Sequence, residues 1–160
     1  MKPVINLDQL SFEPFARGPF EQRHATIGSR IGATSLGYNL TIVPPGKRAC
    51  PFHNHHANEE MFLILDGSGQ LRFGDEMFTL RKYDVIACPA GTRDVAHQII
   101  NTGTEDLTYL ALSTTQRVEI CEYPDSDKIG AYVGDHGQMD LRALFRAEGA
   151  VDYMEGEAPG

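Results

Sequence analysis

Apolar and polar residues alternate in short runs along most of this chain. Sixteen Gly and nine Pro are scattered between the runs rather than pooled in one segment. Short runs with a period of two, bounded by turn residues, predict β-strands, and many such strands at near-regular spacing predict a sandwich or a small barrel. We therefore expect an all-β fold with strands at residues 38–43, 60–65, 70–73, 76–80, 83–88, 97–100, 107–112 and 118–122.

Residues 139–147 have a different spacing. Leu141, Leu144 and Phe145 stand at positions i, i+3 and i+4, with good helix formers between them, and Gly149 follows as a plausible C-terminal cap. This spacing predicts one short C-terminal helix that covers a sheet edge or packs on the barrel wall.

The length of 160 residues fits a single domain. Residues 1–25 have no clear period, so we expect an N-terminal arm with at most one edge strand. Residues 26–123 form the predicted barrel. Residues 124–160 form a C-terminal extension that contains the short helix.

Charge and cysteine content narrow the class of protein. The formal charge of −8 argues against a nucleic-acid partner, because a phosphate backbone selects clustered Lys and Arg. Three widely spaced Cys, an odd number, indicate reduced thiols in a cytoplasmic protein. The chain has neither the apolar run of a signal peptide nor one long enough to cross a bilayer. We expect a cytoplasmic protein without membrane contact.

Half of the six His in the chain lie within residues 53–56. In an extended strand the side chains of His53 and His55 point to one face, and that of His56 points to the other. Two imidazoles and one carboxylate can hold a divalent ion, and Glu59 or Glu60 can supply the carboxylate after a short bend. The cluster alone is compatible with a metal site, but a His-rich tract is more often a solvated turn.

The surroundings of this cluster complete the predicted site. Phe62 and Ile64 alternate with Glu60 along the next expected strand, which places an apolar floor beneath the polar groups. His97 lies farther along the chain in a β-like run, and it is the best available fourth ligand.

These spacings resemble the two sequence motifs of the cupin family. The first motif has a leading Gly, then His-x-His, four residues, Glu, six residues and Gly. Here His53, His55, Glu60 and Gly67 have that spacing, while Gly46 stands one residue farther from the first His than usual. The match selects Glu60 over the preceding Glu, and the first two His over the third.

The second motif is present with two departures. Pro89-x-Gly91 is intact, and so is His97 followed after three residues by Asn101. Tyr83 occupies the position of the leading Gly, and five residues rather than two separate Gly91 from His97. The three additional residues imply a longer turn before that His.

The resemblance extends from residue 46 to about residue 120, and it implies a double-stranded β-helix, the jelly-roll barrel of cupins. It also implies one divalent metal ion (Fe, Mn, Zn or Ni) inside the barrel, with the ligands His53, His55, Glu60 and His97. Residues 122–126 are similar to the corresponding segment of bacterial single-domain cupins, some of which are called sugar-phosphate isomerases by analogy. Such cupins commonly form homodimers through edge strands and an N-terminal arm, a role that residues 12–20, rich in Phe and Pro, fit.

Other residues near the motifs have simpler structural explanations. We interpret His56 as an exposed neighbour of the ligands, Cys50 as a small buried residue, and Asp84 and Asn101 as turn residues. Apolar side chains on the strands are expected in the core, namely Phe62, Ile64 and Ile99. Arg48 and Arg93 are expected on the solvated surface, which is the commoner place for an arginine. The alternative is a position at the barrel mouth, where they could bind an anionic substrate.

Several functions are compatible with this ligand set. A Lewis-acid metal supports an isomerase or epimerase acting on a small oxygenated molecule, and the same chelation suits a lyase or decarboxylase. Iron or manganese supports a dioxygenase. A non-catalytic module that binds or senses a small molecule is the alternative outside enzymes. Isomerisation needs a general base, for which Glu59 and His56 are candidates that the sequence does not place.

Overall fold

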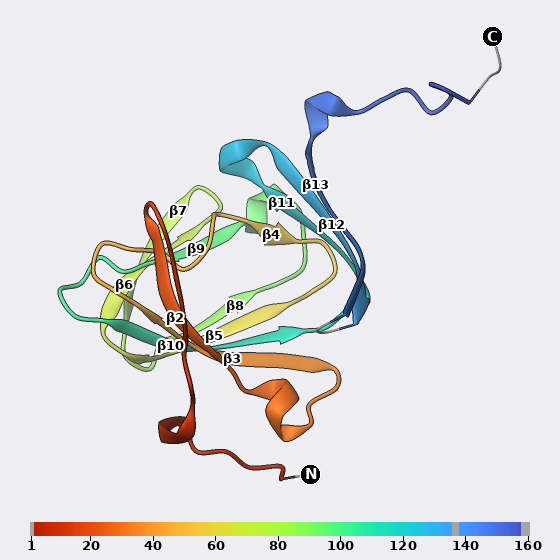
Figure 1. Cartoon of the computed structure of the whole chain (residues 1–160). Coiled ribbons are helices and arrows are strands. Elements are labelled where there is room, and N and C mark those ends of the chain that lie inside the picture. Colours follow the sequence, from red (N-terminus) through yellow and green to blue (C-terminus); the bar gives the residue numbers. More distant parts are fainter. Residues whose placement is uncertain (1, 136–137, 158–160) are drawn as a thin grey trace.

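The predicted all-β fold is confirmed in the computed structural model, which describes residues 2–135 and 138–157. The strands pair antiparallel throughout and form a jelly-roll barrel (Figure 1). The helical elements of the described residues are short 3₁₀ turns: η1 (Leu7–Gln9), η2 (Gly28–Ile31), η3 (Arg93–Val95), η4 (Pro124–Ser126) and η5 (Ala147–Gly149). None of these helices has the length and apolar character needed to cross a bilayer.

Three sheets make up the barrel. The largest has the order β1 (Glu13–Arg17), β2 (Phe20–Thr26), β3 (Leu36–Val43), β10 (Leu107–Thr114), β5 (Glu60–Asp66) and β8 (Val85–Cys88). The second has the order β13 (Gln138–Arg146), β12 (Lys128–Asp135), β11 (Val118–Tyr123) and β4 (Asn54–His55). The third has the order β7 (Glu76–Arg81), β6 (Ser68–Phe73) and β9 (His97–Ile100).

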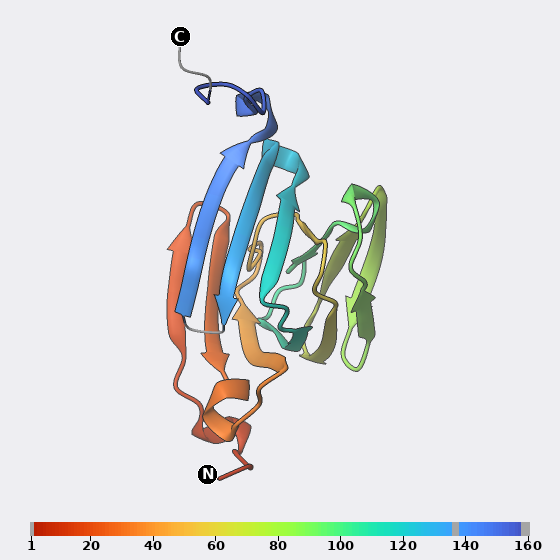
Figure 2. The ribbon, with the colours of Figure 1, turned by 90° about the vertical axis from the view of Figure 1, so that its right-hand side faces the viewer.

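The sheets enclose one apolar core. Figure 1 shows β11–β13 as one wall, with β6, β7 and β9 on the other side and β3, β5 and β10 between them. Turned by 90°, the molecule presents β11–β13 as an outer layer (Figure 2). The predicted core residues Phe62, Ile64 and Ile99 are buried within this core, as are Val43 and Leu107. Burial of these side chains is the main favourable contribution to folding.

Most expected strands coincide with observed ones to within a few residues. The expected hairpin at residues 70–80 is confirmed, because β6 pairs with β7 from Ser68–Arg81 to Phe73–Glu76. Gly74 has a positive φ in its turn, and a Cβ there would lie 2.6 Å from the Asp94 carbonyl oxygen. A residue with a side chain would therefore clash at this turn.

The predicted C-terminal helix is wrong. Residues 138–146 form the edge strand β13, which pairs with β12 from Lys128–Arg146 to Asp135–Gln138. Leu141 and Phe145 are four residues apart, an even number that a strand also places on one face, so their spacing does not separate helix from strand. Backbone hydrogen bonds to β12 decide in favour of the strand.

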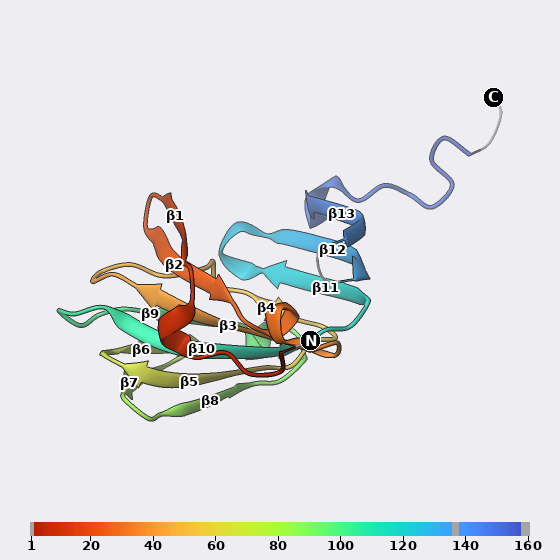
Figure 3. The ribbon, with the colours of Figure 1, turned by 60° about the horizontal axis from the view of Figure 1, so that its bottom comes forward.

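The N-terminal arm contains more structure than its weak pattern indicates. β1 and β2 form a hairpin, and β2 also pairs with β3, which joins residues 20–26 to the largest sheet (Figure 3). At the other end, β12 and β13 extend the second sheet, and the segment after η5 leaves the barrel (Figure 1). Residues 136–137 and 158–160 of the expected C-terminal extension lie outside the described residues.

Candidate metal centre

Strand β4 brings the three histidines of interest together. On one side it pairs with β11, where Cys121 lies opposite His55. On the other side, His53 and His97 exchange two backbone hydrogen bonds: His97 N donates to His53 O (2.7 Å), and His53 N donates to His97 O (3.2 Å). The three imidazoles thus come from adjacent extended segments and face the barrel interior.

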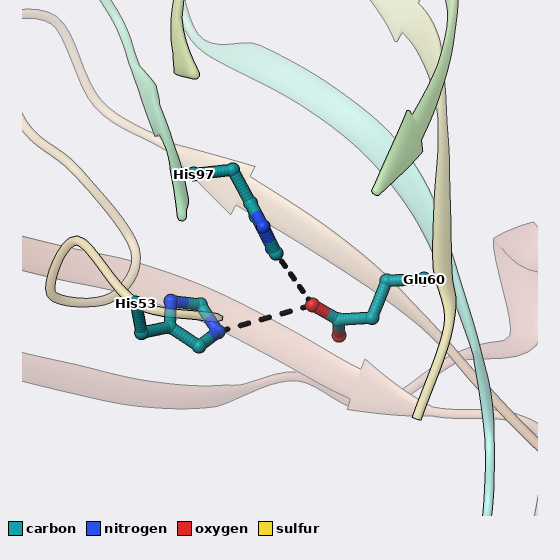
Figure 4. Close-up of side chains that lie close together, drawn as sticks. All are labelled: His53, Glu60 and His97. Atoms are coloured by element: carbon teal, nitrogen blue, oxygen red, sulfur yellow. Dashed lines mark hydrogen bonds and ion pairs between the residues drawn. The ribbon is translucent and has the colours of Figure 1, made fainter. Parts of the chain in front are cut away.

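Glu60 faces these imidazoles from the first position of β5. Its Oε2 atom lies 2.9 Å from His97 Nε2, 3.3 Å from His55 Nε2 and 3.8 Å from His53 Nε2. The donor atoms of His53, Glu60 and His97 all lie within 4.8 Å of one another (Figure 4). Three of the predicted ligands thus form one group, and His55 lies beside it through its contact with Glu60. The side chains of all four are largely buried.

The other ring nitrogen of each histidine faces the protein. His53 Nδ1 lies 2.9 Å from the Pro51 carbonyl oxygen, and His97 Nδ1 lies 3.4 Å from that of Val95. A carbonyl oxygen only accepts hydrogen bonds, so both contacts favour the tautomer with the proton on Nδ1. Each Nε2 atom then directs its lone pair towards Glu60, which is the arrangement found in metal-ligating histidines.

This arrangement fits a cation. A neutral imidazole has one N–H, so His97 cannot donate both to the Val95 carbonyl (3.4 Å) and to the Glu60 carboxylate (2.9 Å). A divalent cation between the Nε2 atoms and Oε2 removes the conflict, because it accepts a lone pair from every one of them. Imidazole nitrogen and carboxylate oxygen are donors that suit Fe, Mn, Zn and Ni.

Without a metal ion, the electrostatics of the protein favour an ion pair between His55 and Glu60. Burial, reinforced by the nearby His97, lowers the pKa of His53 to about 4. Burial opposes charge on His55 and Glu60 as well, yet hydrogen bonds between them and to their neighbours raise the pKa of His55 and lower that of Glu60. The Glu60 carboxylate thus remains ionised in a poorly solvated place, where protonated His55, or a metal ion in its stead, balances its charge.

Strand β11 adds a carboxylate that the sequence did not reveal. Glu119 is buried, and its Oε2 lies 3.4 Å from His55 Nδ1. Cys121 on the same strand face places its Sγ 3.3 Å from that nitrogen. The alternation in residues 118–123 does place Glu119 and Cys121 on one face, but only the pairing of β11 with β4 shows that this face is the inner one.

A cavity of about 640 Å³ opens beside the candidate ligands, a size in the range of small-molecule sites. Its wall includes His53, His55, Glu119, Tyr123 and Tyr132. The two tyrosine hydroxyl oxygens lie 2.9 Å apart. The Tyr123 ring is nearly parallel to that of His53, with 6.2 Å between the ring centroids. The cavity therefore combines aromatic surface with hydroxyl groups.

His56 and Glu59, the two candidates for a general base, lie outside the cavity. His56 points to the outer side of β11, where its Nε2 lies 2.7 Å from Glu122 Oε1, and its imidazole is absent from the cavity wall. Glu59 is exposed and likewise absent from that wall. The opposite directions of His55 and His56 confirm the strand geometry expected for this segment.

The interpretations of Asn101 and Asp84 as turn residues are confirmed. Asn101 is fully buried in its turn, where Nδ2 donates to Val43 O and Glu105 O. Asp84 Oδ2 accepts a hydrogen bond from Arg81 N in the turn before β8. Cys50 differs from the expectation, because the residue is half-buried and lines the cavity. Burial still raises the pKa of its thiol to about 12, so it remains neutral beside His53.

The two arginines lie outside the cavity wall. Arg93 forms ion pairs with Glu122 and Asp127 on the outside of β11. The main chain of Arg48 forms isolated β-bridges with Phe20 on one side and Ile100 on the other. The additional residues between Gly91 and His97 form η3, the longer turn that was expected, and Val95 of this turn supplies the acceptor for His97.

Comparison with known proteins agrees with this geometry. Residues 39–113 match the Cupin_2 family profile, described as a cupin domain. The match includes both predicted motifs and all four candidate ligands.

Solved structures share the cupin fold over most of the chain. A proposed sugar phosphate isomerase from Acidithiobacillus ferrooxidans superimposes with a TM-score of 0.81 at 22% identity, covering 94% of this chain and 96% of that one. A sugar phosphate isomerase from a cupin superfamily of Silicibacter pomeroyi gives 0.77 at 23% identity, covering 92% and 95%. At these identities the likeness concerns the fold.

Two further matches cover a smaller part of the chain. A predicted oxalate decarboxylase from Thermotoga maritima gives a TM-score of 0.60 at 23% identity, covering 69% of this chain and 97% of that one. An uncharacterised protein of Methanocaldococcus jannaschii is 36% identical over 72 residues, which are 45% of this chain and 54% of that protein. The match spans about half the length of this relative.

Proposed function

We propose that the cupin domain binds one divalent transition-metal ion and acts on a small hydroxy-carbonyl compound as an isomerase or epimerase. The proposed ligands are His53, His55, Glu60 and His97. The observation that carries the proposal is the convergence of three Nε2 atoms on one Glu60 oxygen beside a small-molecule cavity. The names of the Acidithiobacillus and Silicibacter structures are consistent with this reaction class.

The residues of the chain divide the work. When bound, the ion supplies a Lewis acid that polarises a carbonyl or hydroxyl oxygen. His53 and His55 present the centre to the cavity, while the Tyr123 ring provides a flat surface on which a substrate can pack. The hydroxyl pair of Tyr123 and Tyr132 is the group that would hold or pass a proton at the substrate oxygens.

One observation favours a non-catalytic binding module as the second candidate. Glu119 lies in the cavity wall, but its carboxylate already accepts three backbone hydrogen bonds, so it is poorly suited to remove a proton from carbon. A module that binds or senses a small oxygenated molecule needs the metal and the cavity without such a base. Conversion of an aldose, ketose or sugar phosphate by the metal-loaded protein distinguishes the enzyme from the module.

Metal analysis of two variants tests the proposal. Protein purified without added metal is expected to contain a stoichiometric divalent ion by elemental analysis, and iron would favour a dioxygenase over an isomerase. His55→Ala removes a ligand that faces Glu60 and is expected to lose most of the metal. His56→Ala removes an outward imidazole and should retain it. Equal loss in both variants would contradict the proposed ligand set.

The proposal also includes a homodimer in the cytoplasm. The three cysteines are free thiols, as expected in a reducing compartment. The edge strand β1, within the Phe- and Pro-rich residues 12–20, is exposed along its whole length. An exposed edge strand is a ready site for pairing with a second strand, and we propose that a second copy of this chain supplies it.

A further inference from the structure

Glu119 connects strand β11 with the turn that follows the second histidine. Its side chain belongs to a residue only 6% exposed. Oε1 accepts hydrogen bonds from His56 N (3.0 Å) and Ala57 N (3.1 Å), and Oε2 accepts one from Asn58 N (2.7 Å). One carboxylate thus holds three consecutive backbone N–H groups in the segment between His55 and Glu60.

The same carboxylate faces the ring of His55. Oε2 lies 3.4 Å from His55 Nδ1, while His55 Nε2 faces Glu60 on the other side of the ring. An ionised carboxylate only accepts hydrogen bonds, so this neighbour favours a proton on Nδ1. With Nδ1 protonated, the lone pair of the neutral ring is on Nε2.

We propose that Glu119 is a positioning residue that selects the tautomer of His55 and thereby aims its Nε2 lone pair at the metal centre. This inference rests on the proposed function. It assigns to β11 the role that the Pro51 and Val95 carbonyls have for His53 and His97. Each histidine then has a protein acceptor behind it, but only that of His55 is an ionised group from a distant part of the chain.

A second arrangement of the same atoms is the rival to this proposal. His55 Nδ1, Glu119 and Cys121 also lie within 4.8 Å of one another and could themselves ligate an ion. In that case Nδ1 would carry the metal rather than a proton. The two arrangements make opposite demands on Cys121, which is dispensable in the first and a ligand in the second.

Glu119→Gln is the decisive variant. A carboxamide has the same shape, but its NH₂ group cannot accept, so it opposes either a backbone N–H or the proton on His55 Nδ1. Affinity for Zn²⁺, measured by competition with a chelator, is expected to fall roughly 10- to 100-fold, the usual effect of losing such a partner. Glu122→Gln makes the same chemical change on the opposite face of β11 and is the matched control, with unchanged affinity. Cys121→Ala should also retain wild-type affinity.

Imidazole ¹⁵N spectra of the Zn²⁺-loaded wild-type protein provide a readout that depends on no variant folding. The proposal expects His55 to be metallated at Nε2 and protonated at Nδ1. Metallation at Nδ1, loss of zinc in Cys121→Ala, or unchanged affinity in Glu119→Gln each overturns it. A wild-type protein that binds none of Fe²⁺, Mn²⁺, Zn²⁺ and Ni²⁺ overturns the proposed function together with this inference. Binding that survives Glu119→Gln overturns the inference alone.

Discussion

At the scale of single residues, Tyr83 shows how the fold overrides a local preference. It stands where the second cupin motif has a Gly, and its φ is +75°. The turn is closed by hydrogen bonds from Tyr83 N to Ile64 O (2.8 Å) and from Asp84 N to Arg81 O (3.1 Å). The left-handed conformation is thus required by the turn rather than by the residue, and a side chain there is unfavourable.

Tyr83→Gly is therefore expected to stabilise the protein. The Tyr83 side chain belongs to a residue that is 74% exposed, so its removal costs little burial. Relief of the left-handed strain should raise the free energy of unfolding by about 1 kcal/mol, measured by urea denaturation. Gly67→Ala is the opposite control, because at φ +80° its Cβ would lie 2.4 Å from the Asp106 carbonyl oxygen. A less stable Tyr83→Gly protein would contradict this account.

At the scale of elements, β13 marks the limit of the periodicity argument. Leu141, Leu144 and Phe145 are 49%, 47% and 48% exposed, so neither face of this edge strand is buried much more than the other. A half-buried strand is recognised in a sequence by apolar residues on one face and polar residues on the other, and β13 lacks this alternation. The i, i+3, i+4 spacing of the three residues is therefore the same as that of an amphipathic helix.

Hydrogen exchange distinguishes the strand from the predicted helix. In an edge strand every second N–H points to the neighbour, so amides of residues 138–146 should alternate between slow and fast exchange. A helix would instead protect consecutive amides, since each N–H bonds to the carbonyl four residues before it. Residue-resolved exchange by NMR is the measurement. Amides of β12, which pairs on both sides, serve as the fully protected reference.

At the scale of the whole molecule, the exposed edge of β1 bears on the proposed homodimer. Two copies of β1 paired antiparallel about Phe15 would place Glu13 of each copy opposite Arg17 of the other. Phe15, which is 48% exposed, would lie across from its own counterpart. Opposite charges and aromatic pairs across strands are both favourable. The strand is therefore self-complementary in sequence.

A charge exchange tests this pairing. Glu13→Arg places like charges opposite one another twice and should shift the monomer–dimer equilibrium towards monomer, measured by sedimentation equilibrium at micromolar concentration. The double variant Glu13→Arg with Arg17→Glu restores opposite charges and should restore dimerisation. Wild-type protein that sediments as a monomer, or a double variant no better than the single one, would exclude β1 as the interface.

The amino-acid sequence by itself determined the features that depend on the spacing of residues within one segment of the chain. The strand pattern and the opposite directions of His55 and His56 follow from local geometry, because side chains alternate in any extended strand. The choice of Glu60 over Glu59 came from the resemblance to the first cupin motif. Their assembly did not follow in the same way. The partners of β13, the acceptor behind His55 and the residues of the cavity wall come from distant segments. Backbone groups are chemically alike, and only the packing of three sheets against one another selects which of them meet.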